Sequence, residues 1–203
     1  MFPFSLPHAD KLFKRYFDRW YSPADRQAKG FIATRPDMLA APALVGGDAG
    51  SVSLLSPEDS AHALQQVASM LDAARGDWPT YLAVRDPIDI HWVEAFDAYY
   101  DKKQVKGLIA RSAPHDFGND YLVTACEFGS VLGHVLKQRL DRLEWVAAHP
   151  YWECSLLDPR TGNLIPVFHW AIKKLSSYGL DDGFGDKIEA CLRLLDSESE
   201  GRA

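Results

Sequence analysis

The sequence predicts an α+β fold, in which helices pack on a small antiparallel sheet of about three to four strands in the C-terminal half and the N-terminal half is helical. Two observations support this prediction. Apolar residues recur at helical spacing in several segments, as expected for helices with one buried face. Short β-prone runs separated by turn-forming residues follow between residues 143 and 167.

Helix signals occur along the whole chain. Ser56 precedes a proline and two acidic residues, which together form an N-terminal cap, and Asn119 or Asp120 can cap a long helix. The segment 102–111 is interpreted as a helix, with a strand as the alternative. The other helices are expected at residues 10–28, 56–75, 88–100, 168–178 and 186–195, and Asp186 can cap the last of them. In the helix at 56–75 the residues expected to face inward are Ala61, Leu64, Val67, Ala68 and Leu71.

The first of these helices carries an aromatic stripe. Leu12, Phe13, Tyr16, Phe17 and Trp20 follow helical spacing, and basic residues flank them. We expect the stripe to pack on the body of the protein, with the long basic side chains lying around it. The alternative is a helix that binds a membrane surface or a partner, as in a structural subunit that docks into a larger bacterial complex.

Two segments fall outside the regular pattern. Residues 30–56 are rich in glycine, alanine and proline, and we expect an irregular excursion there. Residues 196–203 form a polar tail that we expect to be disordered. The rest of the chain, residues 1–195, is predicted to be a single domain.

The predicted sheet lies in the C-terminal half. Strands are expected at residues 143–147, 151–157 and 164–167, with a further candidate at 80–84. Residues 158–163 contain a proline and a glycine at positions that favour a turn. Because Pro166 has no amide hydrogen, its strand should lie at an edge of the sheet or end there.

The composition limits the class of protein. The chain has 203 residues, of which 47% are hydrophobic and 25% charged, as is ordinary for a globular protein. The net charge of −6 argues against binding of nucleic acid, which requires a cationic face. No apolar run reaches the roughly 18 residues of a membrane span, and the amino terminus does not resemble a signal peptide, so we expect a cytoplasmic protein.

A polar stripe on the long helix contains the first candidate site. Glu127, Ser130, His134 and Lys137 are spaced by three or four residues and therefore share one face. Glu127 lies among small and apolar neighbours, where burial would raise its pKa into a range suited to acid–base catalysis. The alternative is an exposed face with weak ion pairs along the helix.

The same helix contains Gly129 and Gly133, one turn apart on one face. Glycine weakens a helix, so its presence here indicates that another element or a ligand approaches the backbone closely. We favour close packing by another element of the protein.

The second candidate site joins the strand at 151–157 to the helix that follows it. His169 begins that helix, where it could pair with Glu153 as an acid–base couple or as metal ligands. A capping or otherwise satisfied histidine is the alternative. Alternation along the strand places Glu153 on one face and Trp152 on the core-facing one. The candidate binding residues are Trp152, Trp170, His134, Lys173 and Arg160, although a solvated face is the alternative for the basic ones.

Other chemistries have little support. The chain has no HxH, HExxH or GxSxG motif, so we expect no metal, no cofactor and no serine nucleophile. Cys126, Cys154 and Cys191 are widely spaced in apolar surroundings, which is typical of inert, reduced thiols.

The segments ACEFGSVLG, LEWV and SLLDPRTGNLIPVFHWAIKKL follow one another in residues 119–176. The order is a helix with internal glycines, a strand, a second strand that ends in an Asp-Pro-x-Thr-Gly turn, a third strand that contains a proline, and a short helix. This order resembles a group of uncharacterised bacterial α+β domains. Some of those domains lie near toxin–immunity loci. The resemblance implies a binding or immunity role and no catalytic residues.

Two main functional hypotheses follow. The acidic balance and the lack of a catalytic motif favour a non-enzymatic protein-interaction module of the immunity or adaptor type, with a protein partner. The alternative is a small hydrolase or transferase that uses Glu127, Glu153 and His169 as acid and base groups in one pocket. Exposed aromatic side chains around Trp152 would favour the first hypothesis.

Overall fold

The computed structural model describes residues 5–22, 55–179 and 183–200. The predicted excursion at residues 30–56 therefore lies almost entirely outside the described residues, as do residues 201–203 of the predicted tail. The described part is mainly helical and carries a small antiparallel sheet in its C-terminal half, so the predicted α+β fold class is confirmed. None of its helices is long and apolar enough to cross a membrane.

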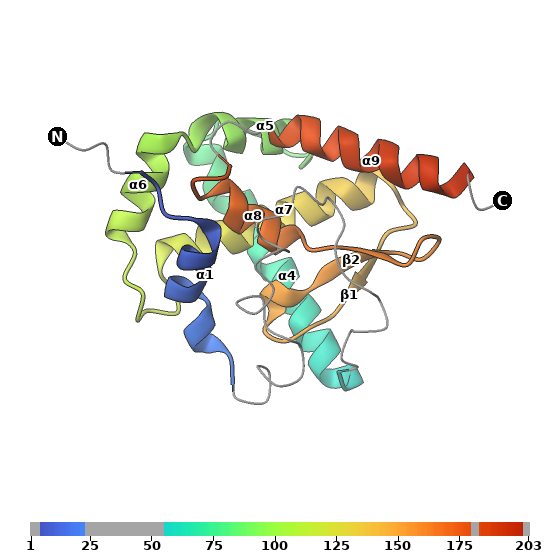
Figure 1. Ribbon diagram of the computed structural model, residues 1–203, viewed down its shortest axis with the longest axis horizontal. Coiled ribbons are helices and arrows are strands. Elements are labelled where there is room, and N and C mark those ends of the chain that lie inside the picture. Colours follow the sequence, from blue (N-terminus) through green and yellow to red (C-terminus); the bar gives the residue numbers. More distant parts are fainter. Residues whose placement is uncertain (1–4, 23–54, 180–182, 201–203) are drawn as a thin grey trace.

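The long helix α7 (Asp120–Arg139) lies at the centre of the structure (Figure 1). Its first turn is capped by Asn119, whose side-chain oxygen accepts a hydrogen bond of 3.0 Å from the amide of Leu122. Helix α4 (Pro57–Asp77) and helix α8 (Val167–Lys174) both pack against it. Because α7 is covered on several sides, buried residues occupy most of its circumference rather than a single stripe.

The two glycines of α7 allow these close contacts, as expected. A Cβ atom at Gly129 would lie 2.4 Å from Cδ1 of Phe168 in α8, and one at Gly133 would lie 2.3 Å from Cζ2 of Trp145 in the sheet. Both distances are far inside van der Waals contact, so only glycine fits at these positions without a shift of the neighbouring ring.

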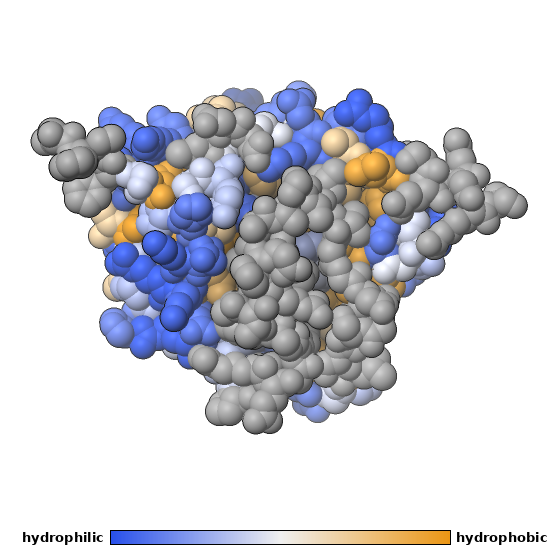
Figure 2. Space-filling model, in the orientation of Figure 1, coloured by the Kyte–Doolittle hydropathy of each residue, from blue (hydrophilic) through white to orange (hydrophobic). Residues whose placement is uncertain are grey.

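The aromatic stripe near the amino terminus faces inward, as predicted. Helix α1 (Ala9–Tyr16) buries Leu12, Phe13 and Tyr16, and the Tyr16 hydroxyl donates a 3.0 Å hydrogen bond to the carbonyl of Ile109 in α6 (Lys102–Arg111). The surface over α1 and α6 is mostly hydrophilic (Figure 2). The helix ends at Tyr16 and a 3₁₀ turn, η1 (Asp18–Trp20), follows, so the predicted helix at 10–28 is shorter within the described residues.

Helices α5 (Ile90–Tyr99) and α9 (Phe184–Glu200) pack together on another side of the core. The amide of Phe184 donates a 3.3 Å hydrogen bond to Oδ2 of Asp97 in α5. Asp97 therefore takes the capping role that the sequence assigned to Asp186. The helix continues to Glu200, beyond the end predicted near residue 195.

The sheet contains strands β1 (Glu144–Val146), β2 (Ser155–Asp158) and β3 (Asn163–Ile165) in the order β1-β2-β3. Both pairings are antiparallel, with Trp145 opposite Leu156 and Leu156 opposite Ile165. Gly162 has a φ of +76° in the connecting turn. Pro166 follows the edge strand β3 and precedes α8, which confirms the position predicted from its missing amide hydrogen.

Several predicted elements were wrong in detail. Residues 80–84 are not a strand, because a 3₁₀ turn η4 (Trp78–Thr80) continues from α4 into an irregular segment. Tyr151–Glu153 forms a 3₁₀ turn, η5, so the predicted strand at 151–157 begins only at Ser155. The amides of Glu153 and Cys154 donate hydrogen bonds of 2.8 and 3.0 Å to the carbonyls of Pro150 and Tyr151, which form the turn, and the amide of Ala148 donates one of 3.3 Å to Sγ of Cys154.

Helix α4 follows its predicted cap but not its predicted inward face. The amide of Asp59 donates a 3.1 Å hydrogen bond to Oγ of Ser56, and the helix continues two residues past the predicted end to Asp77. Val67 is buried, whereas Ala61 and Ala68, which the periodicity placed inward, are exposed. The helix therefore contacts the core through a narrow face.

Candidate functional site

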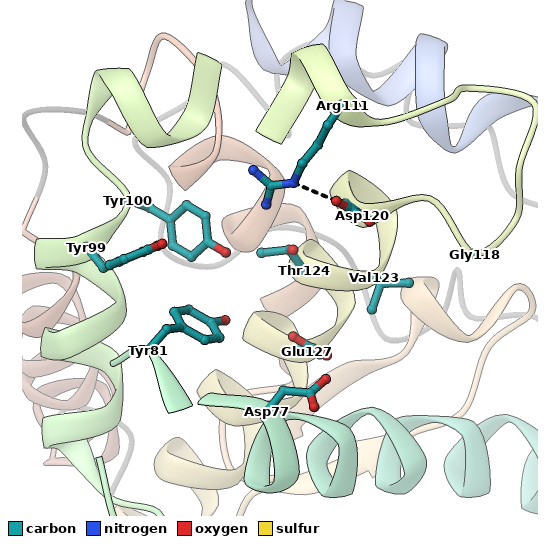
Figure 3. A pocket seen from close by; sticks show the side chains of 10 residues that line it. All are labelled: Asp77, Tyr81, Tyr99, Tyr100, Arg111, Gly118, Asp120, Val123, Thr124 and Glu127. Carbon is teal, nitrogen blue, oxygen red and sulfur yellow. Dashed lines mark hydrogen bonds and ion pairs between the residues drawn. The ribbon is translucent and has the colours of Figure 1, made fainter. Parts of the chain in front are cut away.

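A pocket of about 280 Å³ lies where the ends of α4, α5, α6 and α7 meet (Figure 3). Glu127 and Asp77 lie side by side on one side of it, three tyrosines form a wall, and an arginine and a further aspartate lie at the opposite end. The polar and aromatic lining residues are Asp77, Tyr81, Tyr99, Tyr100, Arg111, Asp120, Thr124 and Glu127.

Glu127 is the buried acidic group of this pocket. Its side chain is 5% exposed, and the indole Nε1 of the fully buried Trp78 donates a 2.9 Å hydrogen bond to its Oε2. Burial raises the pKa of Glu127 to about 7, the Trp78 hydrogen bond opposes this rise, and the nearby charge of Asp77 adds to it. The raised pKa expected from the sequence is therefore present, and the carboxyl group changes its charge close to neutral pH.

The tyrosines form an aromatic wall with polar tips. The ring centroids of Tyr81 and Tyr99 are 5.1 Å apart, as are those of Tyr99 and Tyr100. The hydroxyl of Tyr100 points towards Thr124 of α7 (Figure 3). Burial raises the pKa of both Tyr81 and Tyr100, so both keep their phenol protons at neutral pH.

The charges of the pocket are mainly acidic. Nε of Arg111 lies 2.6 Å from Oδ2 of Asp120, so the positive charge of the pocket is already paired. Asp77 is exposed and makes no side-chain hydrogen bond or ion pair within the described parts of the chain. Once Glu127 is ionised, its carboxylate and that of Asp77 remain without a cation.

Glu153 and His169 do pair, but in another place. Nε2 of His169 lies 3.3 Å from Oε2 of Glu153. Two hydrogen bonds continue from this pair, because the indole of Trp152 donates to the hydroxyl of Tyr21, and this hydroxyl donates to Glu153. His169 is 3% exposed. Neither residue lines the Glu127 pocket, so the three predicted acid–base candidates do not converge. The Glu153–His169 pair connects η5 to α8 inside the protein, and Tyr21, which follows η1, is bonded to Glu153.

The predicted binding residues are also separated from one another. Trp152 and Trp170 are 1% and 5% exposed, so their rings belong to the core and form no exposed aromatic patch. His134 lies on α7 at a second pocket, Lys173 is half-buried on α8, and Arg160 is exposed in the turn between β2 and β3. The prediction that Trp152 faces the core is confirmed by its burial, although the residue lies in a 3₁₀ turn and not in a strand.

The polar stripe of α7 is present and is divided between two pockets. Glu127 lines the pocket of Figure 3, whereas Ser130, His134 and Lys137 line a second pocket beside α4. Burial lowers the pKa of His134, and the charge of Arg75 lowers it further. The alternative interpretation of this stripe, an exposed face with ion pairs along the helix, is therefore not what forms here.

Sequence reasoning missed the tyrosines and Arg111. The signal that could have indicated them is the pair Tyr99–Tyr100 at the end of α5, because adjacent residues of a helix point about 100° apart and a single narrow apolar stripe does not account for both. Tyr100 is buried and Tyr99 is half-buried, and both line the pocket.

Metal and thiol chemistry find no further support. No group of three or more histidine, cysteine, aspartate or glutamate side chains in the described parts of the chain could hold a metal ion. Burial raises the pKa of Cys126 and of Cys191 to about 12, which leaves both as unreactive thiols at neutral pH. Comparisons with protein-family models, with curated proteins and with solved structures gave no match to this chain.

Proposed function

We propose that this protein is a non-enzymatic binding module whose Glu127 pocket receives a cationic group, namely a lysine side chain of a protein partner. The observation that carries the proposal is the combination of a tyrosine wall with carboxylates that lack a cationic partner in one concave site. Aromatic faces attract cations by about 0.5–2 kcal/mol, and carboxylates add a direct charge attraction. The predicted resemblance to domains near toxin–immunity loci is consistent with a protein partner.

The electrostatics of the pocket favour a cation over an anion. Arg111 is held by Asp120, so it offers little to an anionic ligand. Glu127 and Asp77 lie next to each other, and their mutual repulsion is one cause of the raised pKa of Glu127. A bound ammonium group would relieve this repulsion and would shift Glu127 towards its ionised form. Binding should therefore strengthen as the pH rises through about 7.

A second candidate function has one observation in its favour. A carboxyl group with a pKa of about 7 is suited to proton transfer at neutral pH, so Glu127 could act as an acid–base catalyst in the same pocket. The hydrolase or transferase hypothesis then depends on Glu127 without Glu153 and His169, which lie elsewhere. A ligand that is consumed rather than merely bound would favour this candidate.

A pair of matched probes tests the proposal by nuclear magnetic resonance. The indole N–H of Trp78 is bonded to Glu127 and therefore reports on the pocket, and its signal is assigned with Trp78→Phe. We expect Nα-acetyl-lysine methylamide to shift this signal with a Kd on the order of 1–10 mM, and the uncharged norleucine analogue to leave it in place.

Two variants provide the controls. Glu127→Gln removes the charge with little change in shape and should weaken lysine binding about tenfold at pH 8. Asp141→Asn makes the same change in net charge at an exposed site outside the pocket and should bind as the wild type does. An unchanged Trp78 signal with both probes, or equal lysine binding by Glu127→Gln and the wild type, would contradict the proposal.

A further inference from the structure

A second pocket of about 360 Å³ lies between α4 and α7 and shares no lining residue with the Glu127 pocket. Its walls are mainly apolar and come from Leu64, Val67 and Leu71 of α4 and from Trp145 of β1. Leu64, Leu71 and Trp145 are only partly buried, so apolar surface remains uncovered here.

The Trp145 ring, which lines the pocket, is positioned by close packing against α7. The indole lies directly against the backbone of α7 at Gly133, where a Cβ atom would be 2.3 Å from its Cζ2 atom. Glycine at this position lets the ring come close to the helix backbone, and the ring in turn lines one side of the pocket. The pocket therefore has a fixed aromatic surface.

Ser130 supplies a polar group that the fold leaves unused. It lines the pocket, it is 1% exposed, and its Oγ atom has no hydrogen-bond partner among the residues that the structure describes. A serine in a helix commonly donates to a carbonyl one turn earlier, and a buried hydroxyl without a partner costs about 1–3 kcal/mol. Such an orphaned group in a pocket wall indicates a ligand that completes its hydrogen bonding.

The cations near the pocket are already engaged. Nζ of Lys137 donates to the carbonyl of Leu143, and Arg75 is paired with Asp72 and Asp86. Burial lowers the pKa of His134, whose ring is also bonded to the side chain of Gln138 at 2.9 Å. Arg75 therefore offers little to an anionic ligand, and Lys137 already uses one of its three hydrogen-bond donors on the protein backbone.

We propose that this pocket binds a small, uncharged, mainly apolar molecule that carries one hydroxyl group, which forms a hydrogen bond with Ser130. The apolar walls of α4 and the Trp145 ring hold the body of the ligand. The ligand hydroxyl satisfies the Ser130 Oγ atom, and this bond gives the site its preference for an alcohol or phenol over a hydrocarbon.

The test compares two ligands of almost equal shape, 4-methylphenol and toluene, with the intact protein. The indole N–H signal of Trp145, assigned with Trp145→Phe, reports binding. We expect both ligands to shift it, with 4-methylphenol binding about 3- to 10-fold more tightly. In Ser130→Ala this ratio should fall to about 1, because the hydroxyl of 4-methylphenol then has no partner in the pocket and toluene has no hydroxyl to lose one.

A matched pair of helix variants tests the location. Ala68 and Ala61 are both exposed residues of α4, but only Ala68 lines the pocket. Ala68→Phe should abolish the shifts caused by both ligands, and Ala61→Phe should leave them unchanged. The inference is overturned if neither ligand shifts the Trp145 signal in the wild type, if the two ligands bind with equal affinity, or if Ser130→Ala keeps the preference for the phenol.

Discussion

Replacement of Glu127 by glutamine should change how the stability of this protein depends on pH. The carboxyl group is 5% exposed, and its Oε2 accepts a hydrogen bond from the indole of Trp78. A glutamine carbonyl accepts the same hydrogen bond and carries no charge at any pH. The variant therefore removes the ionisation and keeps the contact.

The magnitude follows from the pKa of Glu127. Burial raises this pKa from 4.5 to about 7 in the folded protein, so between these values the folded state holds a proton that the unfolded state has released. The free energy of unfolding of the wild type should consequently fall as the pH rises from about 4.5 to about 7, and stay low above it. At about 1.4 kcal/mol for each pKa unit, the full loss is about 3 kcal/mol.

Urea unfolding of both proteins between about pH 5 and about pH 8.5 measures this effect, with the free energy extrapolated to zero denaturant. The other titrating groups are the same in both proteins and cancel in the difference. We expect Glu127→Gln to gain about 2–3 kcal/mol relative to the wild type over this interval. Free energies that change in parallel in the two proteins would refute the buried-carboxyl explanation, and Asp141→Asn should show such parallel behaviour because Asp141 is exposed.

Two further predictions concern packing and buried charge. Gly133→Ala should destabilise the protein by about 2 kcal/mol, because the new methyl group collides with Trp145. Gly76→Ala is the control: its added Cβ has no atom within 4 Å, and it should stabilise the protein by up to about 1 kcal/mol. Thermal and urea unfolding compare the two variants. Asp97→Ala should cost about 3–5 kcal/mol in the same assay, because it leaves the charge of Lys174, 3% exposed, without its partner; a loss below about 1 kcal/mol would contradict this explanation.

Local rules predicted most of the helices but could not predict where strands pair. Caps and periodicity suffice for α4 and α7 because Ser56 and Asn119 bond amides within three residues along the chain. The segment Tyr151–Glu153 has the sequence pattern of a strand, yet backbone hydrogen bonds close it into a 3₁₀ turn, and the chain on either side of it is joined by the contact between Ala148 and Cys154. That contact depends on how the loop closes and leaves no periodic signal in the sequence.

The sequence predicted one residue of the candidate site, Glu127, and did not predict the residues that surround it. A carboxylate among small and apolar neighbours indicated that Glu127 would be buried, and this held because nearly the whole circumference of α7 is covered. The tyrosine wall comes from the irregular segment after α4 and from the end of α5, whose approach to α7 is decided by packing. Glu153 and His169 illustrate the reverse case, since their predicted contact at 3.3 Å exists but lies apart from the pocket.

The sequence by itself determined the fold class, the positions of most helices and the unusual placement of Glu127, because these depend on contacts between near neighbours in the chain. Only the tertiary structure decided which polar groups share a pocket. Glu127 meets Asp77 and Tyr81 because the end of α4 crosses α7 at that point, and Ser130, one turn further along the same helix, faces a different pocket. Residues one turn apart can thus belong to separate sites, since the neighbouring elements determine what each of them meets.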